Sequence, residues 1–373
     1  MRFVAFSDIH YSNYATGVTS EDVAAVERQV TDYCLAQSIK VVLFNGDRFL
    51  SHQPNDYDRL LADREQRHRN DSGILTFSLT GNHDYWGKGA TSGHSNRFAK
   101  ELWADYHQNL VIMDEPKSYS HEGTAMIVHA LPAGFEFDMK NYQIDPDRFN
   151  VLVFHDLLAG TVIDVQSQFK MEQGMNRDSL DHSCFDMVLG GDVHIPQKIE
   201  FKNTVGGYIG SCIFQSRRDR GDSRGFIDVT LSDTKQHKTT FIESRCPCFV
   251  DCEWDVTKLG FPSSLMIEQY VQSVWERSCQ GNIVDLVFKG TRADLDAMPK
   301  DYLEKMKAEL KARRVNPPMK VQPMNIVSGV TQMVKSVTAQ EDLDVFIKSG
   351  KVDLQGLDPT RLLEKGQKVL KSL

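Results

Sequence analysis

Features that would define several protein classes are scarce in this sequence. It has seven cysteines, an odd number spread widely over 373 residues. A disulfide framework is therefore not expected, and a reducing cytosol is the expected compartment. No apolar run approaches the 18 residues that indicate a membrane span. The apolar start of the chain meets a charge at Asp8, which does not fit a secretory signal. We therefore expect a cytoplasmic globular protein with no membrane partner.

Basic charge is also in deficit. Lys and Arg number 43 against 51 Asp and Glu, which gives a net charge of −8. Because phosphate binding depends on Lys and Arg, such a chain is not an obvious free-standing binder of nucleic acid. The charge is uneven, since residues 1–300 carry −12 and residues 301–373 carry +4. Any nucleic-acid contact is therefore expected to be local or to need a partner.

Three of the cysteines form a group that resembles a zinc site. Cys246, Cys248 and Cys252 are close in sequence, but a fourth ligand is missing nearby. The segment CPCFVDCEW has the composition of a strand instead. We therefore favour a strand here over a zinc site.

Short apolar runs that end abruptly in polar residues dominate residues 1–230. They span residues 1–7, 41–44, 74–79, 151–154 and 187–189. Each has the length of a strand and is flanked by Gly or charge, and helical patterns such as residues 21–37 lie between some of them. Such an alternation predicts an α/β fold with both sheet faces covered. In these folds ligands bind beyond the carboxyl ends of the strands.

The pattern changes after about residue 240. Residues 249–254 and 282–289 are predicted strands, and residues 263–277 and 301–314 are predicted helices. A breaker, Asn316-Pro317-Pro318, precedes two shorter helical pieces at residues 341–349 and 359–371. We therefore predict a core domain over residues 1–240, a small α+β domain over residues 241–315, and a linker with a helical tail over residues 316–373.

Residue types that commonly bind metals stand at the ends of the five apolar runs. They are Asp8 with His10, Asp47 after Gly46, Asn82, His83 and Asp84 after Gly81, His155, and Asp192 with His194. One such residue alone is more often a cap or a satisfied core histidine, but five groups in order are hard to explain by packing. The set mixes imidazole, carboxylate and carboxamide without thiolate, which favours Mn²⁺, Fe²⁺ or Mg²⁺ over structural zinc.

A pair of such cations holds a phosphate between them and converts bound water to hydroxide, which is the chemistry of phosphoester hydrolysis. A histidine nearby neutralises charge or protonates the leaving oxygen. His83 is placed for that role, and Asp84 is expected to orient it.

The ordered set D-x-H, G-D, G-N-H-D, H and G-(H/D)-x-H resembles that of the calcineurin-like metallophosphoesterases. The segments FSDIHYS, LFNGDRFLSHQP, SLTGNHDYW, FDMVLGGDVHIPQKI and YIGSCIFQS resemble the SbcD branch, the nuclease subunit of an SbcCD-type DNA repair complex. The resemblance covers about residues 1–230. The length of the chain suggests a bacteriophage version of the SbcD protein. It implies a four-layer αββα core, a small α+β cap that binds DNA, and a helical tail.

The resemblance also implies a role for each residue of the set. Asp8, His10, Asp47 and His194 would hold one Mn²⁺, and Asp47, Asn82, His155 and Asp192 would hold the second, with Mg²⁺ as the alternative ion. His83, supported by Asp84, would act on the scissile phosphate. The family pattern has His at position 192. Asp192 is either a competent variant ligand, harder and more negative, or the mark of a weakened second site.

Residues near the motifs are candidates for DNA contact. Arg217, Arg218, Arg220 and Arg224 lie in the segment SRRDRGDSRGF, which is either a solvated loop or a set of phosphate contacts. His52 follows the Asp47 loop and is a further candidate.

The resemblance implies a Mn²⁺-dependent DNA nuclease, a 3′–5′ exonuclease on duplex DNA and an endonuclease on single strands or hairpins. It would work in recombination, repair and replication with an SbcC-type ATPase bound by the tail, as a homodimer within a heterotetramer. Two alternatives stay open. One is a small-substrate phosphodiesterase or phosphatase with the same site, and the other is a DNA-end-binding scaffold with a weakened site.

Overall fold

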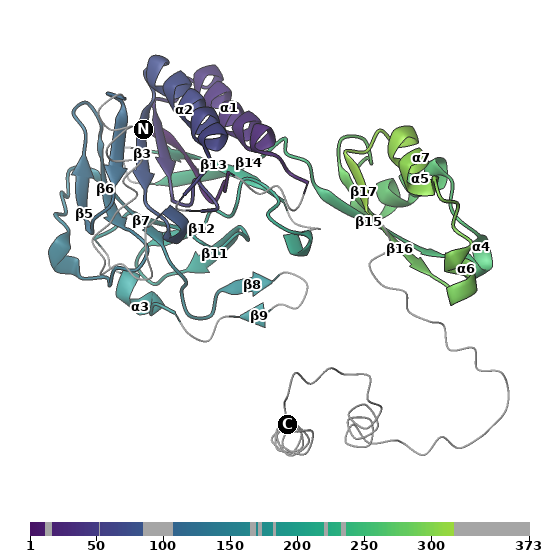
Figure 1. The fold of residues 1–373 in the computed structure, drawn as a ribbon. Helices are drawn as coiled ribbons and strands as arrows, with labels where there is room; N and C mark the ends of the chain where they lie inside the picture. The colour runs from purple at the N-terminus through teal and green to yellow at the C-terminus, as the bar shows by residue number, and fades with distance from the viewer. Residues whose placement is uncertain are drawn as a thin grey trace, which may run out of the picture. The chain divides into compact units, whose positions relative to one another are not determined.

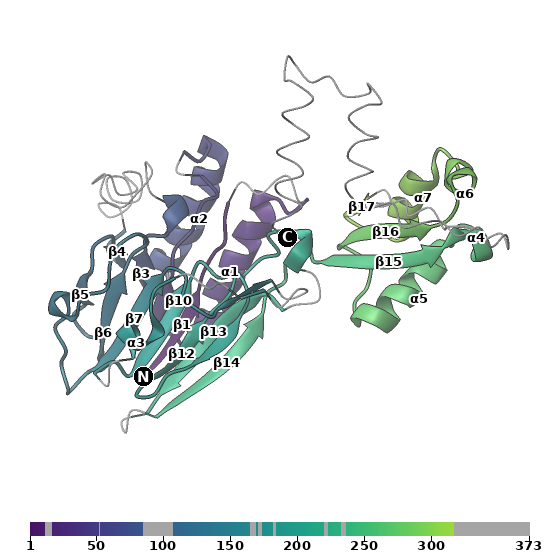
Figure 2. The ribbon, with the colours of Figure 1, turned by 90° about the horizontal axis from the view of Figure 1, so that it is seen from below.

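The computed structural model (Figures 1 and 2) describes residues 1–11, 17–51, 53–84, 107–164, 169–170, 174–181, 184–219, 223–232 and 236–316. The chain divides into two compact units, Met1–Pro323 and Met324–Leu373, and every described residue belongs to the first. The helical pieces predicted at 341–349 and 359–371 therefore lie outside the described residues. Within the described ranges, no helix combines the length and apolar character needed to cross a bilayer.

Two six-stranded mixed sheets form the body of the fold. The first has the order β14 (His237–Glu243), β13 (Gly225–Leu231), β1 (Arg2–Phe6), β2 (Val41–Phe44), β3 (Leu75–Leu79) and β4 (Leu110–Met113). The second has the order β11 (Gln197–Glu200), β12 (Val205–Tyr208), β10 (Met187–Gly191), β7 (Phe149–His155), β6 (Met126–Leu131) and β5 (Lys117–Ser120). The strands β1 to β4 are parallel neighbours, as are β6, β7, β10 and β12. The five runs predicted from the sequence are β1, β2, β3, β7 and β10.

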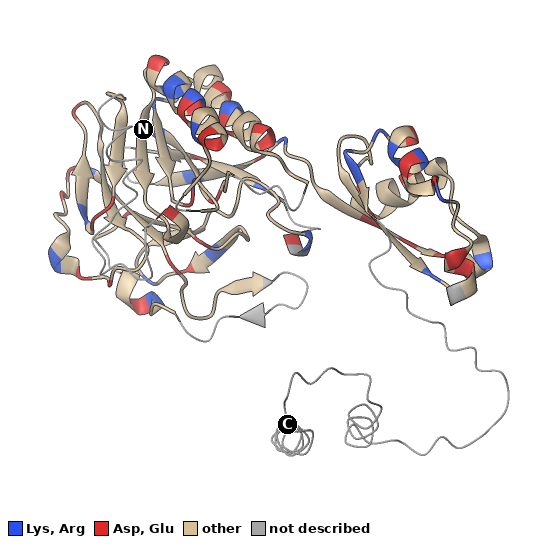
Figure 3. Ribbon diagram, viewed as in Figure 1, with Lys and Arg blue, Asp and Glu red and all other residues tan. Residues whose placement is uncertain are grey.

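Helices α1 (Ser20–Ala36) and α2 (Asp56–Asp71) pack side by side on the outer face of the first sheet (Figure 1). Helix α1 begins with a capping box between Thr19 and Asp22, which satisfies N–H groups that the first turn leaves unpaired. Its buried face carries Val23, Val26 and Val30, the spacing of an apolar helical stripe. In Figure 3 basic and acidic residues alternate over both helices, so this face has no charge of a single sign.

The two sheets face each other across one apolar core. Alternate residues of the inner strands supply it, among them Phe3, Leu43, Phe77, Val128 and Val153, as a sheet buried on both faces requires. The outer face of the second sheet is covered, within the described residues, by Tyr142, Leu180 and Phe185 from loops and from the short α3 (Arg177–Leu180). The predicted α/β fold with two sheets between outer layers is confirmed, although this outer layer is thin.

A separate three-stranded parallel sheet, with the order β15 (Phe249–Asp255), β16 (Ile283–Lys289) and β17 (Arg314–Asn316), follows the core. Its helices are α4 (Val256–Leu259), α5 (Ser264–Trp275), α6 (Arg292–Asp296) and α7 (Tyr302–Glu309). We call residues 249–316 the small subdomain. The prediction of one helix over 301–314 is wrong at its end, because Lys311 adopts φ of 49° and Arg314 pairs with Ile283 of β16. Helix α7 therefore ends at Glu309, and the following residues form the edge strand β17.

Candidate metal centre

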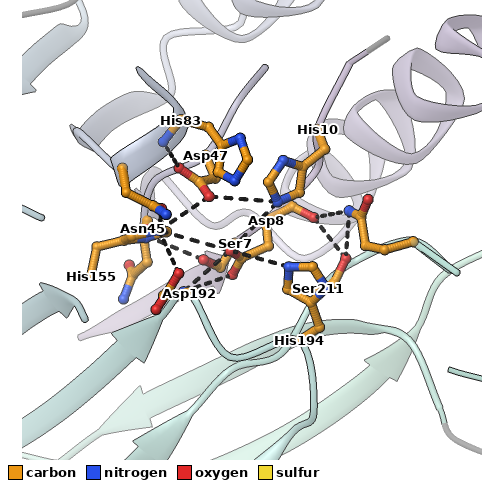
Figure 4. Close-up of polar contacts among 12 residues, drawn as sticks. Ser7, Asp8, His10, Asn45, Asp47, His83, His155, Asp192, His194 and Ser211 are labelled. Carbon is orange, nitrogen blue, oxygen red and sulfur yellow. Dashed lines mark hydrogen bonds and ion pairs between the residues drawn. The ribbon is translucent and has the colours of Figure 1, made fainter. Parts of the chain in front are cut away.

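The ligand candidates of both sheets converge on one point (Figure 4). Asp8 and His10 follow β1, Asp47 follows β2, and Asn82 and His83 lie in the 3₁₀ turn η2 (Asn82–Asp84) after β3. From the second sheet, His155 ends β7, and Asp192 and His194 follow β10. The carboxyl ends of parallel strands from two facing sheets therefore build one site, as the sequence predicts.

The spacing of the ligand atoms fits bound cations. His155 Nε2 lies 3.3 Å from Asp47 Oδ2 and 4.0 Å from Asp8 Oδ1. His10 Nε2 lies 3.6 Å from Asp47 Oδ2, and His194 Nε2 lies 4.0 Å from Asp8 Oδ1. In octahedral coordination with bonds of about 2.1 Å, adjacent ligands are about 3 Å apart and opposite ones about 4 Å. The observed separations span that range.

Among the described residues, three overlapping groups can hold an ion: Asp8 with His10 and His194, His10 with Asp47 and His83, and Asp8 with Asp47 and His155. Asp8, His10 and Asp47 recur in two groups each, which places these three side chains at the centre. Asp192 reaches the same place, with Oδ1 3.9 Å from His155 Nε2.

Two polar side chains, the buried His10 and the exposed Asn82, show that this donor set suits a cation. Both ring nitrogens of His10 are buried without a hydrogen-bond partner in the described part of the chain. The Asn82 amide places one terminal atom 3.0 and 3.2 Å from the two Asp47 oxygens and 3.1 Å from His155 Nε2. With its nitrogen inward this amide donates to the carboxylate, whereas with its oxygen inward it joins a group of acceptors that a cation would hold together.

Two of the candidate histidine ligands are in the deprotonated state that metal binding requires. Burial lowers the pKa of His10 to about 3 and that of His194 to about 4, so both imidazoles are neutral at pH 7. Burial raises the pKa of Asp8 to about 7, and the Asp47 charge adds to that shift. A cation at Asp8 would therefore displace a proton.

His155 is oriented from behind. Its Nδ1 lies 2.6 Å from the Asn45 carbonyl oxygen, which only accepts, so Nδ1 carries the proton and Nε2 faces the ligands. Burial lowers the pKa of His155, but the carboxylates of Asp47 and Asp8 outweigh burial and raise it well above the ordinary value.

Backbone strain concentrates at the site. Asp8, His10, Asp47 and Asp192 all have positive φ, at 53°, 41°, 57° and 77°, a region that residues other than Gly occupy at a cost. The first two loops hold each other there, since Asp8 N–H donates to Gly46 and His10 N–H donates to Asp47. Gly46 is needed at φ of 99°, because a Cβ would lie 2.4 Å from His155 Nδ1.

Asp84 differs from its predicted role. Its carboxylate accepts backbone N–H groups of Asp47 and Gly81, both at 3.0 Å, and of Arg48 at 3.2 Å. The ring of His83 is held instead through Nδ1 by the Leu50 carbonyl at 2.8 Å. Asp84 is therefore a positioning residue that joins the loops after β2 and β3, and the expectation that it orients the His83 ring is corrected.

The predicted arginine cluster has a different location in the structure. The Arg224 side chain is fully buried, with Nη2 3.1 Å from Asp219 Oδ1 and Nη1 donating to the His194 carbonyl at 2.5 Å. The prediction of a DNA contact is therefore wrong for Arg224. Arg217 Nε lies 3.1 Å from Asp285 Oδ2 of the small subdomain. His52 and Arg220 lie outside the described residues, and only the backbone of Arg218 is described.

A second layer of residues supports the ligands, and sequence reasoning did not single it out. The Asp8 carbonyl accepts from Ser211 Oγ at 2.7 Å and from Gln215 Nε2 at 2.9 Å. Both residues lie in the segment YIGSCIFQS, so a signal was present in the sequence.

Glu27 of α1 belongs to the same supporting layer and is completely buried. Its carboxylate meets Arg48 Nη1 at 2.7 Å, Arg69 Nη2 at 2.6 Å and Tyr11 Oη at 2.8 Å. Tyr11 follows the ligand His10, and Arg48 follows the ligand Asp47. One buried carboxylate therefore anchors two of the three ligand loops of the first sheet, those after β1 and β2.

A two-sheet α/β fold with a mixed histidine and carboxylate centre at its strand ends defines a metal-dependent phosphoesterase. Residues 1–196 match the family described as calcineurin-like phosphoesterase, and the chain belongs to this family. The predicted class, a metal-dependent phosphodiesterase, is thereby confirmed.

The chain is similar to the DNA double-strand break repair protein Mre11 of Haloferax volcanii, with 27% identity over 261 residues. The match covers 68% of this chain and 54% of that protein, so the chain spans about half the length of the curated relative.

Two solved structures are also similar. A dimetal phosphatase from Danio rerio has 10% identity and a TM-score of 0.41, with 66% of this chain and 98% of that chain covered. An archaeal phosphodiesterase has 11% identity and a TM-score of 0.34, with 65% and 100% covered.

Proposed function

We propose that this chain is a Mn²⁺-dependent DNA nuclease, acting as a 3′–5′ exonuclease on duplex DNA and as an endonuclease on single strands or hairpins. The observation that carries the proposal is the convergence of two buried carboxylates and three imidazoles on one point beside His83. The similarity to a double-strand break repair protein supports DNA as the substrate.

Two ions would share Asp47 as the bridging ligand. Asp8, His10 and His194 would complete one site, and Asn82, His155 and Asp192 the other. The bound ions would supply a hydroxide nucleophile and neutralise charge on the phosphate. Burial keeps the imidazoles of His10 and His194 neutral, whereas the pKa values of Asp8 and His155 are raised, so a bound cation would displace their protons. Asn45, Asp84 and Glu27 hold the ligand residues in place.

His83 would assist at the leaving oxygen. Because its Nδ1 donates to the Leu50 carbonyl, Nε2 is the nitrogen available to substrate. The ring lies 5.0 Å from that of His10 in an edge-on arrangement, and its side chain is only partly buried. In the ligand sets proposed here His83 is not a metal ligand, although it lies close to His10 and Asp47, so a phosphate at the metal centre would lie within reach of its imidazole.

Asp192 is proposed as a functional variant of the usual histidine. Its N–H donates to Asp8 Oδ1 at 3.2 Å, so its backbone supports a ligand as well. Burial raises the pKa of the Asp192 carboxyl, and a neighbouring cation would favour the ionised form.

The other parts of the chain are proposed to serve DNA and a partner. Residues 1–240 would form the nuclease domain, although β14 reaches Glu243 in the structure, residues 241–315 the cap, and residues 316–373 the tail. His52, Arg217, Arg218 and Arg220 remain candidates for DNA contact. The tail would bind an SbcC-type ATPase, and two nuclease chains would form the homodimer of a heterotetramer.

The experiment is cleavage of end-labelled duplex and hairpin DNA by the purified chain with Mn²⁺, compared with Mg²⁺ and EDTA. Bis-nitrophenyl phosphate is assayed in parallel, and His83→Ala is the control. We expect Mn²⁺-dependent cleavage that His83→Ala strongly reduces while metal binding persists.

The alternatives give different results. Turnover of the small ester without DNA cleavage would favour a small-substrate phosphodiesterase. Tight DNA binding without turnover of either substrate would favour a scaffold. Deletion of residues 325–373 should abolish co-purification with the ATPase and leave small-ester hydrolysis intact, and persistence of the complex would contradict the role of the tail.

A further inference from the structure

The loop that follows β12, residues 211–219, contacts the backbone of two metal-ligand residues at once. Ser211 Oγ and Gln215 Nε2 donate to the Asp8 carbonyl, and Ser211 N–H donates to the His194 carbonyl at 3.0 Å. Asp8 and His194 belong to the same group of candidate ligands. The loop is therefore a common support for one half of the metal centre.

The end of this loop is itself fixed by a buried ion pair. Asp219 Oδ2 accepts from the N–H groups of Gln215 and Ser216 at 2.7 and 2.8 Å, and Asp219 Oδ1 meets Arg224. Arg224 in turn donates to the His194 carbonyl. The loop, Asp219 and Arg224 are thus connected to one another and to the backbones of the two ligands.

The same loop is attached to the small subdomain. Arg217 lies in the 3₁₀ turn η6 (Arg217–Asp219), and its Nε is 3.1 Å from Asp285 Oδ2 in β16. Asp285 is 1% exposed, and its other oxygen accepts from Asn316 Nδ2. Asp251, Asp285 and Asn316 are register partners across the three strands. Arg217 therefore contacts the central member of a row of polar side chains in the small sheet.

We propose that Arg217 is a positioning residue for the metal centre, through which the small subdomain fixes the loop that holds Asp8 and His194. This inference rests on the metal ligation proposed above and adds to it a dependence on a second part of the fold. It also gives Arg217 a positioning role beside the DNA contact for which it remains a candidate.

The chain offers a matched control for this link. Arg313 at the end of the small subdomain meets Asp22 of α1 at 2.6 Å, so it also joins the subdomain to the core. Its described partners are Asp22 and Thr19, neither of which lies in the 211–219 loop. Arg217→Gln and Arg313→Gln each remove one positive charge and one such ion pair.

The test is a titration of the metal-free full-length chain with Mn²⁺. Binding is monitored by isothermal calorimetry and, independently, by the electron paramagnetic resonance signal of free Mn²⁺. Removal of a positive charge by itself strengthens cation binding, so coupling and simple electrostatics predict opposite signs. We expect Arg217→Gln to weaken Mn²⁺ binding about tenfold, Arg313→Gln to leave it unchanged or slightly tighter, and Arg217→Lys to retain most of the affinity.

Thermal unfolding in EDTA verifies that each variant is folded, and Asp285→Asn gives a second way to break the contact. The double variant Arg217→Gln with Asp285→Asn should bind Mn²⁺ no more weakly than either single variant, since both remove one interaction. Unchanged or tighter binding by Arg217→Gln would overturn the inference, as would an equal loss in Arg313→Gln. Asp8→Asn serves as a reference variant that lacks a metal ligand. If the wild-type chain bound Mn²⁺ as little as this variant does, the proposed function itself would be overturned.

Discussion

The two sheets supply their ligands in different ways. In the first sheet, Tyr11 and Arg48, which follow His10 and Asp47, are both fixed by the buried carboxylate of Glu27, which also pairs with Arg69. In the second sheet, His155 is oriented by a carbonyl of the first sheet, and Asp192 N–H donates to the carboxylate of Asp8. The second half of the site is therefore built on the first. Damage to the first half should remove both metals, whereas damage to the second should be partial.

The largest effect is expected from Asp47→Asn, because the proposed bridging ligand serves both halves. We expect cleavage to fall by more than about 100-fold and Mn²⁺ binding to be lost at both sites. Calorimetric stoichiometry measures this directly. Asp228→Asn, a change at a carboxylate distant in the first sheet, is the control, and one full-affinity Mn²⁺ retained by Asp47→Asn would contradict a shared ligand.

Glu27→Gln should come next, since it removes the charge that anchors the loops after β1 and β2. Loss of one partner from a fully buried ion pair costs about 3–5 kcal/mol, measured by urea unfolding in EDTA. Mn²⁺ affinity should also fall about 10–100-fold. Asp228→Asn is the matched control, because the Asp228 carboxylate accepts from Tyr33 Oη at 2.8 Å and from Arg2. The Glu27 carboxylate likewise accepts from one tyrosine and from arginine, Tyr11 and Arg48. Equal metal binding by the two variants would argue against an anchoring role.

The same carboxylate should give stability a dependence on acid. Burial raises the pKa of Glu27, but Arg48 and Arg69 outweigh burial and hold it below the ordinary value. Its stabilisation is then complete above the unfolded pKa of about 4.3 and is lost as the pH falls through the lower folded pKa. The urea midpoint of the wild-type chain in EDTA should drop more steeply below pH 4.5 than that of Glu27→Gln. Parallel curves would show that other carboxyl groups dominate.

The smallest effect is expected at Asp192, in the dependent half. If Asp192 is a competent ligand, Asp192→His should change Mn²⁺-dependent activity by less than about tenfold. Asp192→Ala is the control for loss of the ligand. A large rise in activity or in metal occupancy in Asp192→His would show that the native second site is compromised.

Local sequence patterns were sufficient to predict the ligand positions. An apolar run followed by Asp-x-His or Gly-Asn-His-Asp defines both a strand and what stands at its end, and β2 was predicted at its observed bounds, Val41–Phe44. The edge strands β5, β11 and β14 were less apparent, because they are largely exposed and lack a continuous apolar run.

Contacts between distant parts of the chain could not be predicted in this way. The residues around Arg224 in the sequence have the composition of a solvated loop. In the structure, however, Arg224 contacts Asp219 and the carbonyl of His194, and His194 is brought near only by the fold. Glu27 did leave a trace, since it falls among Val23, Val26 and Val30 on the buried face of α1. A charged residue inside an apolar stripe indicates a buried partner without naming it.

The left-handed backbone at Asp8, His10, Asp47 and Asp192 sets a trade-off between durability and activity. Gly adopts this conformation without steric penalty, whereas a residue with a Cβ adopts it at a cost. Replacement of these ligands by Gly would therefore relax the backbone as it removes the chemistry, so a screen for heat resistance alone would select against the metal centre. Natural sequences retain such costly positions where function requires them.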